Sequence, residues 1–375
     1  MMEVQKYLKE KTLADLKAEL GIKVREYPED NLVLLDYNQI ESPKTHPITI
    51  ECRSLILALD TFDVVSRKFD RFFNLGEAPE TVVDFDFSDA TVMEKADGSI
   101  VGVYHNPHTD RWEVSTRGMA KAEGEHMFGG TWREKIIQAM GLHDEETFQS
   151  YFTEVLTKDN TLILEYCSPE NRIVTKYEDA HVVFLGTRDR TTGEDFDYLT
   201  CECVVENVLS DLNIRMPRVY DATKDGAALV ELANSLQNLE EGFVVRCNKT
   251  GKRVKIKSKT YLVAHKLRGE SAVPTRKNIM NLVLEGEVDE FLAYFPEWSQ
   301  LIREAQAEIE AIEDGLNQHW WNIATGMDLS QKDFALAVKD EKCAWAFFQA
   351  RKNNSHPVDE FRKAQIMQKL KALGV

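Results

Sequence analysis

The sequence predicts an α+β protein, with an antiparallel-sheet region followed by an all-helical region. Short apolar and β-branched runs, separated by Pro, Asp and Asn, recur from Leu32 to Ile256 without alternating regularly with helices. After Leu262 these runs stop, and apolar residues recur at helical spacing. A chain of 375 residues is long enough for two domains, which we place at 1–262 and 263–375.

The individual elements follow from the same periodicities. The first is a helix from Val4 to Leu20, with leucines at helical spacing and Gly21 as its stop. Further helices are predicted at Trp132–Met140, Glu145–Leu156, Cys201–Leu212, Glu297–Asp314, Asp333–Arg351 and Asp359–Leu373. Strands are predicted at Leu32–Leu35, Ser54–Leu59, Val64–Val65, Thr81–Val83, Thr91–Met93, Ile100–Tyr104, Trp112–Thr116, Thr161–Glu165, His181–Leu185, Phe243–Cys247 and Arg253–Ile256.

Composition narrows the class of protein. No apolar run reaches the length of a membrane span, and the first residues lack the apolar stretch of a secretory signal, so we expect a cytoplasmic protein with no membrane partner. Six scattered cysteines show neither a disulfide framework nor metal-ligand spacing. The net charge of −17 argues against non-specific coating of nucleic acid. Against that trend, Gly251–Lys259 holds five cations in nine residues, which indicates a local basic groove.

Lys95 is the first candidate for chemistry. It follows the strand Thr91–Met93 and precedes the turn dipeptide Asp97-Gly98. A lysine at a strand end is partly desolvated, and a glycine lets another molecule approach the backbone, so the amine can act as a nucleophile. Taken alone, the pattern Lys-x-Asp-Gly favours a solvated hairpin turn.

Three later stretches add two acids and two lysines to Lys95 as candidate site residues. Leu162–Tyr166 places Glu165 at the end of an apolar run, and Glu240–Val245 places Glu241 where a strand begins. In Arg253–Lys257 the residues alternate, so Lys255 and Lys257 lie on one face of the strand. Two lysines on one face repel each other unless an anion lies between them. Taken singly, each stretch is also typical of a solvated or protected strand edge.

The order of these motifs resembles that of the covalent nucleotidyltransferases, namely DNA ligases, RNA ligases and capping enzymes. Five stretches narrow the resemblance to the bacteriophage RNA ligase 1 family, the tRNA-repair ligases of tailed phages, over about Leu32 to Tyr261. They are Glu51–Ser54, Arg71–Leu75, Lys95–Ser99, Asn171–Val174 and Lys255–Ser258. The resemblance implies a nucleotidyltransferase (adenylyltransferase) domain at 1–262. The C-terminal helices match only in kind and position.

The resemblance also implies residue roles. Lys95 would attack the α-phosphate of ATP and become lysyl-AMP. Glu165 would bind the ribose, Glu241 would help to hold the metal, and Lys255 and Lys257 would contact the α-phosphate. The remaining nucleotide-site residues that it implies are Arg53 near the β- and γ-phosphates, Tyr37 of a Tyr-Asn pair, and Arg71 and Arg117. The last two are second-rank because arginine stands where the family has lysine, which changes reach and geometry.

The reaction so implied is that of an RNA ligase (ATP), which joins 5′-phosphate and 3′-hydroxyl RNA ends through lysyl-AMP and RNA-adenylate. ATP is the co-substrate, and Mg²⁺ or Mn²⁺ the metal. We expect the cations Lys255, Lys257 and Arg53, together with a bound metal and desolvation, to lower the pKa of Lys95. The expected partners are RNA, in particular tRNA, and an end-healing polynucleotide kinase. The expected form is a monomer, in the host cytosol if a phage encodes it.

Alternatives remain open from the sequence. An ATP-dependent DNA ligase or a capping guanylyltransferase usually carries an OB-fold barrel after the Lys-x-Lys strand, whereas helices follow here. A non-catalytic RNA-binding module would be expected to lose at least one of the five principal residues, yet all are present.

The roles of several C-terminal and aromatic residues are also open. The C-terminal helices could dock tRNA or serve as a structural cap. The basic residues that fit docking are Arg351, Lys352, Arg362, Lys363, Lys369 and Lys371. The aromatic cluster Trp320, Trp321, Trp345, Phe347 and Phe348 favours core packing. Phe184 and Phe243 could each pack on adenine but are better placed as core residues.

Overall fold

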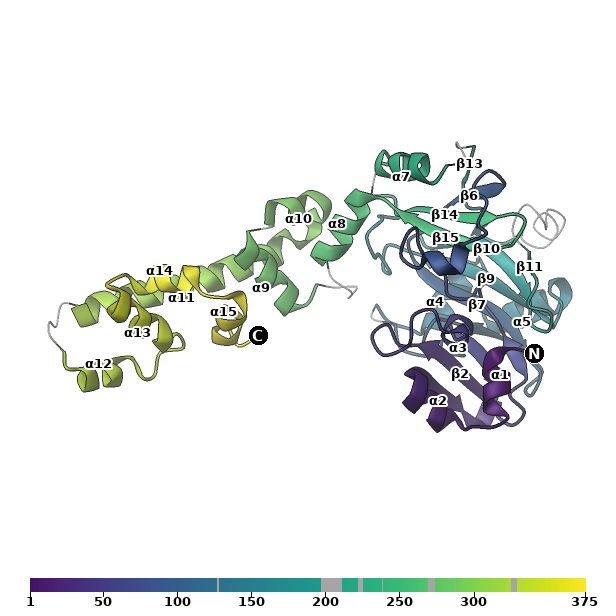
Figure 1. Ribbon diagram of the computed structural model, residues 1–375, viewed down its shortest axis with the longest axis horizontal. Coiled ribbons are helices and arrows are strands. Elements are labelled where there is room, and N and C mark those ends of the chain that lie inside the picture. Colours follow the sequence, from purple (N-terminus) through teal and green to yellow (C-terminus); the bar gives the residue numbers. More distant parts are fainter. Residues whose placement is uncertain are drawn as a thin grey trace. The chain divides into compact units, whose positions relative to one another are not determined.

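The chain divides into two compact units, Met1–Leu262 and Val263–Val375, in the computed structural model (Figure 1). The structure describes residues 1–126, 128–196, 211–221, 225–237, 239–268, 274–286, 288–324 and 329–375. Unit 1 contains three mainly antiparallel sheets with their helices, and the described part of unit 2 is helical. The α+β class predicted from the sequence is confirmed.

The first sheet has the order β1–β2–β3–β4, with every pair antiparallel. Its strands are β1 (Ile22–Tyr27), β2 (Leu32–Tyr37), β3 (Leu55–Ala58) and β4 (Val64–Ser66). All six residues of β2 are buried because both of its faces are covered. Val33 and Leu35 pack against α1 (Glu3–Leu8), α2 (Leu13–Leu20) and α3 (Pro47–Glu51), while Leu32 and Leu34 pack toward Tyr104 and Ala120.

The predicted helix Val4–Leu20 is wrong as one element, because the chain breaks it into α1 and α2. Thr12 begins the second helix: its hydroxyl accepts the backbone N–H of Asp15 at 3.2 Å, and the Asp15 carboxylate accepts the N–H of Thr12 at 2.9 Å. This capping box stabilises a helix start inside the helical pattern. Gly21 ends α2 in the left-handed conformation, as predicted.

The second sheet has the order β11–β10–β9–β7–β8, and β12 pairs in parallel with β10. The strands are β7 (Ser99–Asn106), β8 (Arg111–Ser115), β9 (Asn160–Cys167), β10 (His181–Asp189), β11 (Asp195–Phe196) and β12 (Ile214–Arg215). Two helices, α4 (Trp132–Ala139) and α5 (Glu145–Val155), contribute Ile136, Phe148 and Phe152 to the core of this sheet. Phe184 is fully buried in the same core, which confirms its packing role.

The third sheet carries most of the candidate site and has the order β13–β6–β14–β15–β5. Its strands are β5 (Phe73–Asn74), β6 (Ala90–Glu94), β13 (Val219–Tyr220), β14 (Gly242–Cys247) and β15 (Arg253–Lys257), and α7 (Gly226–Asn234) packs on it. Phe243 is fully buried there and is also a core residue. The predicted strand Thr81–Val83 is wrong: Pro79 starts a 3-10 helix, Pro79–Val82, whose Val82 packs on this core.

The described helices that follow the third sheet are α8 (Lys259–Arg268), α9 (Arg276–Glu285), α10 (Val288–Tyr294), α11 (Ser299–Ala324), α12 (Gln331–Val338), α13 (Ala344–Asn353), α14 (Pro357–Lys363) and α15 (Ile366–Ala372). The predicted helix Glu297–Asp314 is confirmed from Ser299 onward as part of a longer α11, whereas Glu297 and Trp298 lie in the 3-10 helix Pro296–Trp298. Two predictions are wrong as single helices: Asp333–Arg351 is α12 plus α13, and Asp359–Leu373 is α14 plus α15. In the second case Ala364 is extended, which ends α14.

Aromatic residues build part of the unit 2 core. Phe347 is fully buried, and Trp320 and Trp345 pack against that core, as predicted. Trp321 and Phe348 are instead 59% and 43% exposed. Of the predicted helix Cys201–Leu212, residues 201–210 lie outside the described part of the chain. Among the described helices, none has the length and apolar character that a membrane span requires.

A candidate nucleotide-binding site

Lys95 lies directly after β6, at the position the sequence predicts. Its backbone N–H donates to the carbonyl of Gly242 at 2.9 Å, so the strand pairing between β6 and β14 fixes the start of its side chain. The Lys95 amine donates to Oε2 of Glu241 at 2.6 Å. The other oxygen of Glu241 pairs with Lys257 at 2.8 Å, and the Glu241 side chain is only 3% exposed. One buried carboxylate therefore holds two lysines together.

Asp97 fastens the loop that follows Lys95. Its side chain is 2% exposed, and one carboxylate oxygen accepts the backbone N–H groups of Val174 and Thr175, each at 2.7 Å. The other oxygen accepts the Tyr261 hydroxyl at 2.8 Å. The sequence interpretation of Asp97-Gly98 as a simple turn missed this function. The aspartate itself indicated this function, because the carboxylate of an acid in a turn can accept hydrogen bonds from several backbone N–H groups.

Gly98 is required by close approach of the chain's own backbone. A Cβ atom at this position would lie 2.2 Å from the carbonyl oxygen of Tyr166 in β9. We expected the glycine to let another molecule approach, and Gly98 does line the cavity; the space that a Cβ would take is filled by β9. The close contact brings β9, and with it Glu165, against the segment that carries Lys95.

The strand β15 places its lysines as the alternation predicts. Val254 and Ile256 are buried in the core of the third sheet, while Lys255 and Lys257 line a cavity on the other face. Burial, with the nearby charges of Arg53, Lys95 and Lys257, lowers the pKa of Lys255 to about 7. The amine of Lys255 also lies 4.7 Å from the ring centre of Phe72.

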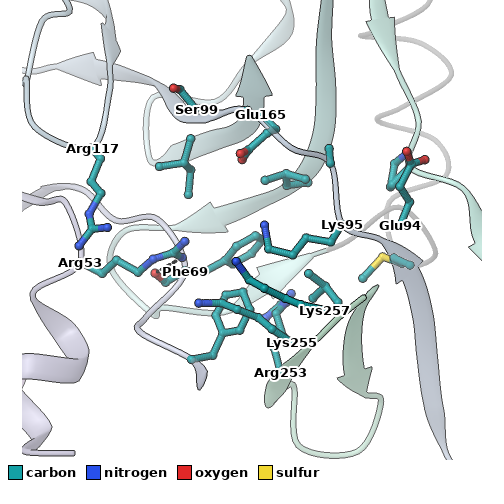
Figure 2. A pocket seen from close by; sticks show the side chains of 18 of the residues that line it. Arg53, Phe69, Glu94, Lys95, Ser99, Arg117, Glu165, Arg253, Lys255 and Lys257 are labelled. Carbon is teal, nitrogen blue, oxygen red and sulfur yellow. Dashed lines mark hydrogen bonds between the residues drawn. The ribbon is translucent and has the colours of Figure 1, made fainter. Parts of the chain in front are cut away.

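Glu165 faces these lysines from β9 (Figure 2). Burial raises the pKa of Glu165 to about 7, against the opposing attraction of Lys95, and the charge of Glu241 adds to the rise. The carboxyl group is therefore divided between its charged and neutral forms near neutral pH. Its charged form can accept a hydrogen bond from a ligand hydroxyl, and its neutral form can donate one.

Arg53 and Arg117 approach the cavity from the side opposite the backbone of Lys95 (Figure 2). Arg53 donates to the carbonyl of Phe69 at 3.2 Å. Nε of Arg117 donates to Oδ2 of Asp36 at 3.1 Å, so an acid of β2 orients this guanidinium. Both side chains line the cavity, where their charge favours an anionic ligand.

Tyr37 and Arg71 lie behind this wall. Neither lines the cavity, although Tyr37 supports it: the guanidinium carbon of Arg71 lies 3.9 Å from its ring centre, and that of Arg117 lies 4.6 Å away. Arg71 instead lines a neighbouring cavity that shares Phe69, Phe72 and Arg253 with the first. The structure therefore brings six of the nine predicted site residues into one cavity, Arg53, Lys95, Arg117, Glu165, Lys255 and Lys257, with Glu241 bound to two of them.

The cavity has a volume of about 380 Å³ and both polar and apolar walls. The apolar lining includes Met93, Ile100, Trp132, Leu185 and Val244. Arg253 also lines it and was missed by the sequence analysis, although it shares a strand face with Lys255 and Lys257. A cationic wall beside an apolar wall suits a ligand with phosphates and a planar apolar part.

The charge state of Lys95 corrects an expectation. Burial acts to lower its pKa, but the charges of Glu241 and Glu165 outweigh burial, so the pKa of Lys95 is raised. Of the cations expected to lower it, Lys257 is paired with Glu241, Lys255 is also attracted by Glu241, and Arg53 by Glu165 and Asp36. Lys95 is therefore protonated when paired with Glu241, and it becomes a better nucleophile only when that pair separates.

The sequence profile of the RNA ligase family matches residues 51–262. A relative from Autographa californica nuclear polyhedrosis virus, named "Putative bifunctional polynucleotide kinase/RNA ligase", is 32% identical over 386 aligned positions, which cover 100% of this chain and 53% of that protein. An RNA ligase of Rhodothermus phage RM378 is 24% identical, covering 65% of each protein. A solved archaeal ATP-dependent RNA ligase aligns with a TM-score of 0.49 and 15% identity, covering 80% of this chain and 79% of that one.

These matches place the chain in a class of known proteins. Because the profile covers more than half of the residues, the chain belongs to the RNA ligase family. Its relatives include viral and phage proteins, in line with the resemblance seen in the sequence. The chain spans about half the length of the baculovirus relative.

Proposed function

We propose that the protein is an ATP-dependent RNA ligase that joins 5′-phosphate and 3′-hydroxyl ends through lysyl-AMP and RNA-adenylate intermediates. One observation carries the proposal. In a member of the RNA ligase family, a lysine at a strand end shares a buried carboxylate with a second lysine, in a cavity with further cations and an acid facing it. This arrangement combines a nucleophile with a phosphate-binding wall.

In the first step Lys95, once its amine has lost its extra proton, forms a bond from Nζ to the α-phosphorus of ATP and releases a second proton to solvent. The bond from that phosphorus to the bridging oxygen breaks, and pyrophosphate leaves. Lys255, Lys257 and Arg53 would stabilise the charge on the phosphate oxygens. A nucleotide that separates Lys95 from Glu241 removes the main interaction that keeps the amine protonated.

The other predicted residues have supporting roles in this proposal. Glu165 would accept a hydrogen bond from a ribose hydroxyl. Arg117 would contact the outer phosphates, oriented by Asp36 and supported by Tyr37. Arg71, in the neighbouring cavity, would act on the far end of the triphosphate or on RNA phosphates.

Mg²⁺ or Mn²⁺ fits the oxygen ligands available. Among the described residues no group of three or more His, Cys, Asp or Glu side chains could hold a metal ion. Glu241 would therefore hold the ion together with phosphate oxygens of the nucleotide, as is common for Mg²⁺. When bound, the metal would neutralise phosphate charge. Glu241 must release at least one lysine to bind it, because each of its oxygens contacts an amine.

In the second step AMP passes from Lys95 to the 5′-phosphate of an RNA end, and in the third a 3′-hydroxyl attacks that phosphate and AMP leaves. We propose tRNA as the natural substrate class, with a polynucleotide kinase preparing the ends. The name of the baculovirus relative, which couples both activities, supports the kinase part.

The test of the function is incubation of the protein with a divalent metal and α-labelled ATP or GTP, followed by a denaturing gel and peptide mapping. We expect label from ATP on the Lys95 peptide, none in Lys95→Ala, and sealing of pre-adenylated RNA by that variant. Lys158→Ala, which removes an exposed lysine, is the matched control and should label normally. Label in Lys95→Ala would disprove the role of Lys95, and label from GTP alone would indicate a capping enzyme. Sealing of DNA in preference to RNA would indicate a DNA ligase.

A further inference from the structure

Lys68 is a buried lysine to which the proposed reaction gives no role. It follows β4, and its residue is 1% exposed. Its amine donates to Oγ of Ser54 at 2.9 Å and to Oγ of Ser115 at 2.8 Å. Among the described residues, no carboxylate forms a hydrogen bond or ion pair with it. A fully buried lysine without an acid partner is rare, because desolvating an ammonium group is costly.

The hydrogen bonds around Lys68 match an uncharged amine. The Ser54 hydroxyl donates its proton to the carbonyl of Thr116 at 3.0 Å, and the Ser115 hydroxyl donates to the carbonyl of Gly102 at 3.2 Å. Both serine oxygens therefore act as acceptors toward Lys68. Two acceptors satisfy the two N–H groups of a neutral amine, whereas an ammonium group has three.

The surrounding backbone is shaped to hold this side chain. At Gly102 of β7, an added Cβ would lie 2.7 Å from Cε of Lys68 and 2.9 Å from Oγ of Ser115. On the other side, Arg188 of β10 donates to the backbone carbonyl of Lys68 at 2.8 Å. Lys68 therefore cannot turn outward without breaking contacts on several strands.

The network joins Lys68 to both arginines of the candidate site. Ser54 directly follows Arg53, and its backbone N–H donates to Oδ1 of Asp36 at 3.2 Å. The other oxygen of Asp36 holds Arg117. Thr116, whose carbonyl receives the Ser54 proton, lines the cavity itself. The amine is thus two hydrogen bonds away from the cavity wall.

The charges that face Lys68 come from several elements. Arg53 repels a proton on the amine, and Asp36 of β2 attracts one. Arg117 pairs with the same Asp36. Arg188 donates to the backbone carbonyl of Lys68 and pairs with Asp70. Gly102 and Ser115, from β7 and β8, do not titrate. Burial is the largest effect, and together with Arg53 it lowers the pKa of Lys68 to about 7.

We propose that Lys68 is a proton-linked positioning residue: neutral in the free protein, it takes up a proton when nucleotide phosphates bind to Arg53 and Arg117. This rests on the proposed function. The phosphates neutralise Arg53, so its repulsion of the amine falls while their own negative charge attracts a proton. A new N–H bond forms on Nζ, and the solvent buffer loses the proton. The charged amine then adds positive charge behind both arginines and so strengthens the attraction of this wall for the triphosphate.

Calorimetry in two buffers of different ionisation enthalpy measures this proton. The probe is α,β-methylene-ATP, which binds without transferring AMP, at a pH of about 8, where an amine with a pKa of about 7 is largely neutral. The proteins are wild type, Lys68→Met and Lys255→Met. The Lys255 variant is needed because Lys255 also has a low pKa and should take up its own proton.

We expect Lys68→Met to bind the analogue with an uptake smaller than wild type by up to about one proton. Equal uptake by wild type and Lys68→Met would overturn the proposal. Failure of every protein to bind the analogue would instead count against the proposed function. Should Lys68→Met not fold, ¹³Cε-lysine NMR of the wild type decides. The Lys68 signal should titrate near pH 7 without the analogue and stay charged at pH 9 with it, and a signal charged at pH 9 in both states would disprove the idea.

Discussion

At the scale of single residues, Asp97 shows how a short motif serves structure as well as chemistry. Its carboxylate connects the Lys95 loop to the segment at Val174 and Thr175 and to the Tyr261 hydroxyl. The three hydrogen bonds that this buried carboxylate accepts fix the backbone beside Lys95. The position of Lys95 therefore depends on a residue that lies outside the cavity lining.

The first prediction at this scale concerns Asp97→Asn. An amide offers one acceptor oxygen and two donors, so part of this network is left unsatisfied. We expect the free energy of unfolding to fall by about 2–3 kcal/mol. Urea denaturation measures it, with Tyr261→Phe as a milder comparison that removes one bond and costs about 1 kcal/mol. A change in Asp97→Asn no larger than in Tyr261→Phe would contradict the prediction.

The second prediction concerns pH and Lys68. The folded protein loses the Lys68 proton above about pH 7, whereas the ordinary lysine value is 10.5. The unfolded chain binds more protons in this interval, so stability rises with pH, by up to about 1.4 kcal/mol per pH unit for one group. Lys255 contributes in the same direction.

Lys68→Met should therefore show a weaker rise in the free energy of unfolding between pH 7 and 9 than wild type. Denaturant titrations at several pH values provide the measurement. Lys158→Met, at an exposed site, should retain the wild-type slope. Identical slopes for wild type and Lys68→Met would mean that Lys68 is not neutral in the folded protein.

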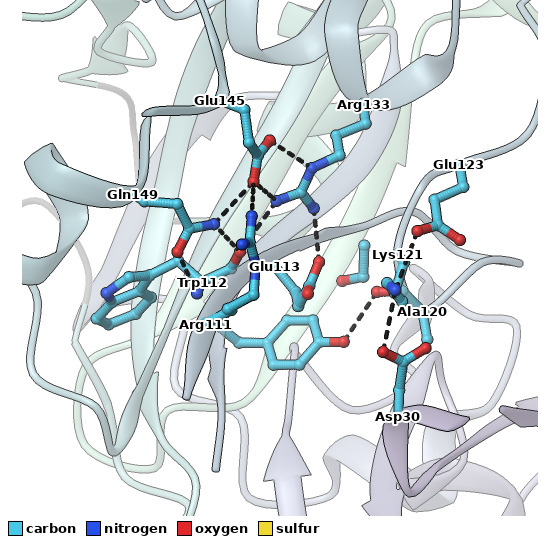
Figure 3. Close-up of polar contacts among 12 residues, drawn as sticks. Asp30, Arg111, Trp112, Glu113, Ala120, Lys121, Glu123, Arg133, Glu145 and Gln149 are labelled. Carbon is cyan, nitrogen blue, oxygen red and sulfur yellow. Dashed lines mark hydrogen bonds and ion pairs between the residues drawn. The ribbon is translucent and has the colours of Figure 1, made fainter. Parts of the chain in front are cut away.

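At the scale of elements, a polar network holds α4 and α5 against β8 (Figure 3). Arg133 of α4 donates to Glu113 of β8 at 2.7 Å and to Glu145 of α5 at 2.8 and 2.9 Å. Gln149 donates to the carbonyl of Trp112 at 2.7 Å. Since β8 leads directly to Arg117, this network also steadies one wall of the cavity.

The third prediction tests that network. Glu113 is 3% exposed, so Glu113→Ala leaves Arg133 with Glu145 as its remaining acidic partner, beside the carbonyl of Trp112. We expect a loss of about 3 kcal/mol in stability. Arg111→Ala removes an exposed partner of the same Glu145 and should cost at most about 1 kcal/mol. Comparable losses in the two variants by thermal or urea unfolding would show that burial does not set the contribution.

At the scale of the whole molecule, the candidate site belongs to unit 1. Every residue that lines the main cavity lies between Arg53 and Lys257, and unit 2 has a core of its own around Phe334, Phe347 and Phe361. We propose that residues 1–262 form the adenylyltransferase domain and that the C-terminal helices dock tRNA. Of their basic residues, Arg362 pairs with Glu313, and Lys369 is buried and donates to a backbone carbonyl, which leaves fewer cations for docking than the sequence indicates.

The fourth prediction follows from this division. A fragment of residues 1–268, cut after α8, should form lysyl-AMP from labelled ATP but lose any preference for tRNA over unstructured RNA. Circular dichroism and thermal unfolding establish that the fragment folds. A folded fragment that takes no label would show that unit 2 is needed for the first step. A fragment with unchanged tRNA preference would make the helices a structural cap.

The sequence by itself determined the α+β class, the strand that ends just before Lys95, the strands that carry Glu165, Lys255 and Lys257, and the shared face of the two lysines. These follow from periodicity and turn residues, which are local properties. Helix ends were less well determined, as the break after Leu8 shows, because the capping box at Thr12 competes with a helical pattern that continues through the break.

Only the tertiary structure decided which residues meet and how they are charged. The pairing of Lys95 with Glu241, the raised pKa of Lys95, the separation of Tyr37 and Arg71 from the cavity, and the burial of Lys68 all join segments far apart in the chain. Desolvation and Coulomb interactions depend on distances in space, which a pattern along one strand does not contain. The sequence therefore indicated the residues for the chemistry, and the fold set their protonation.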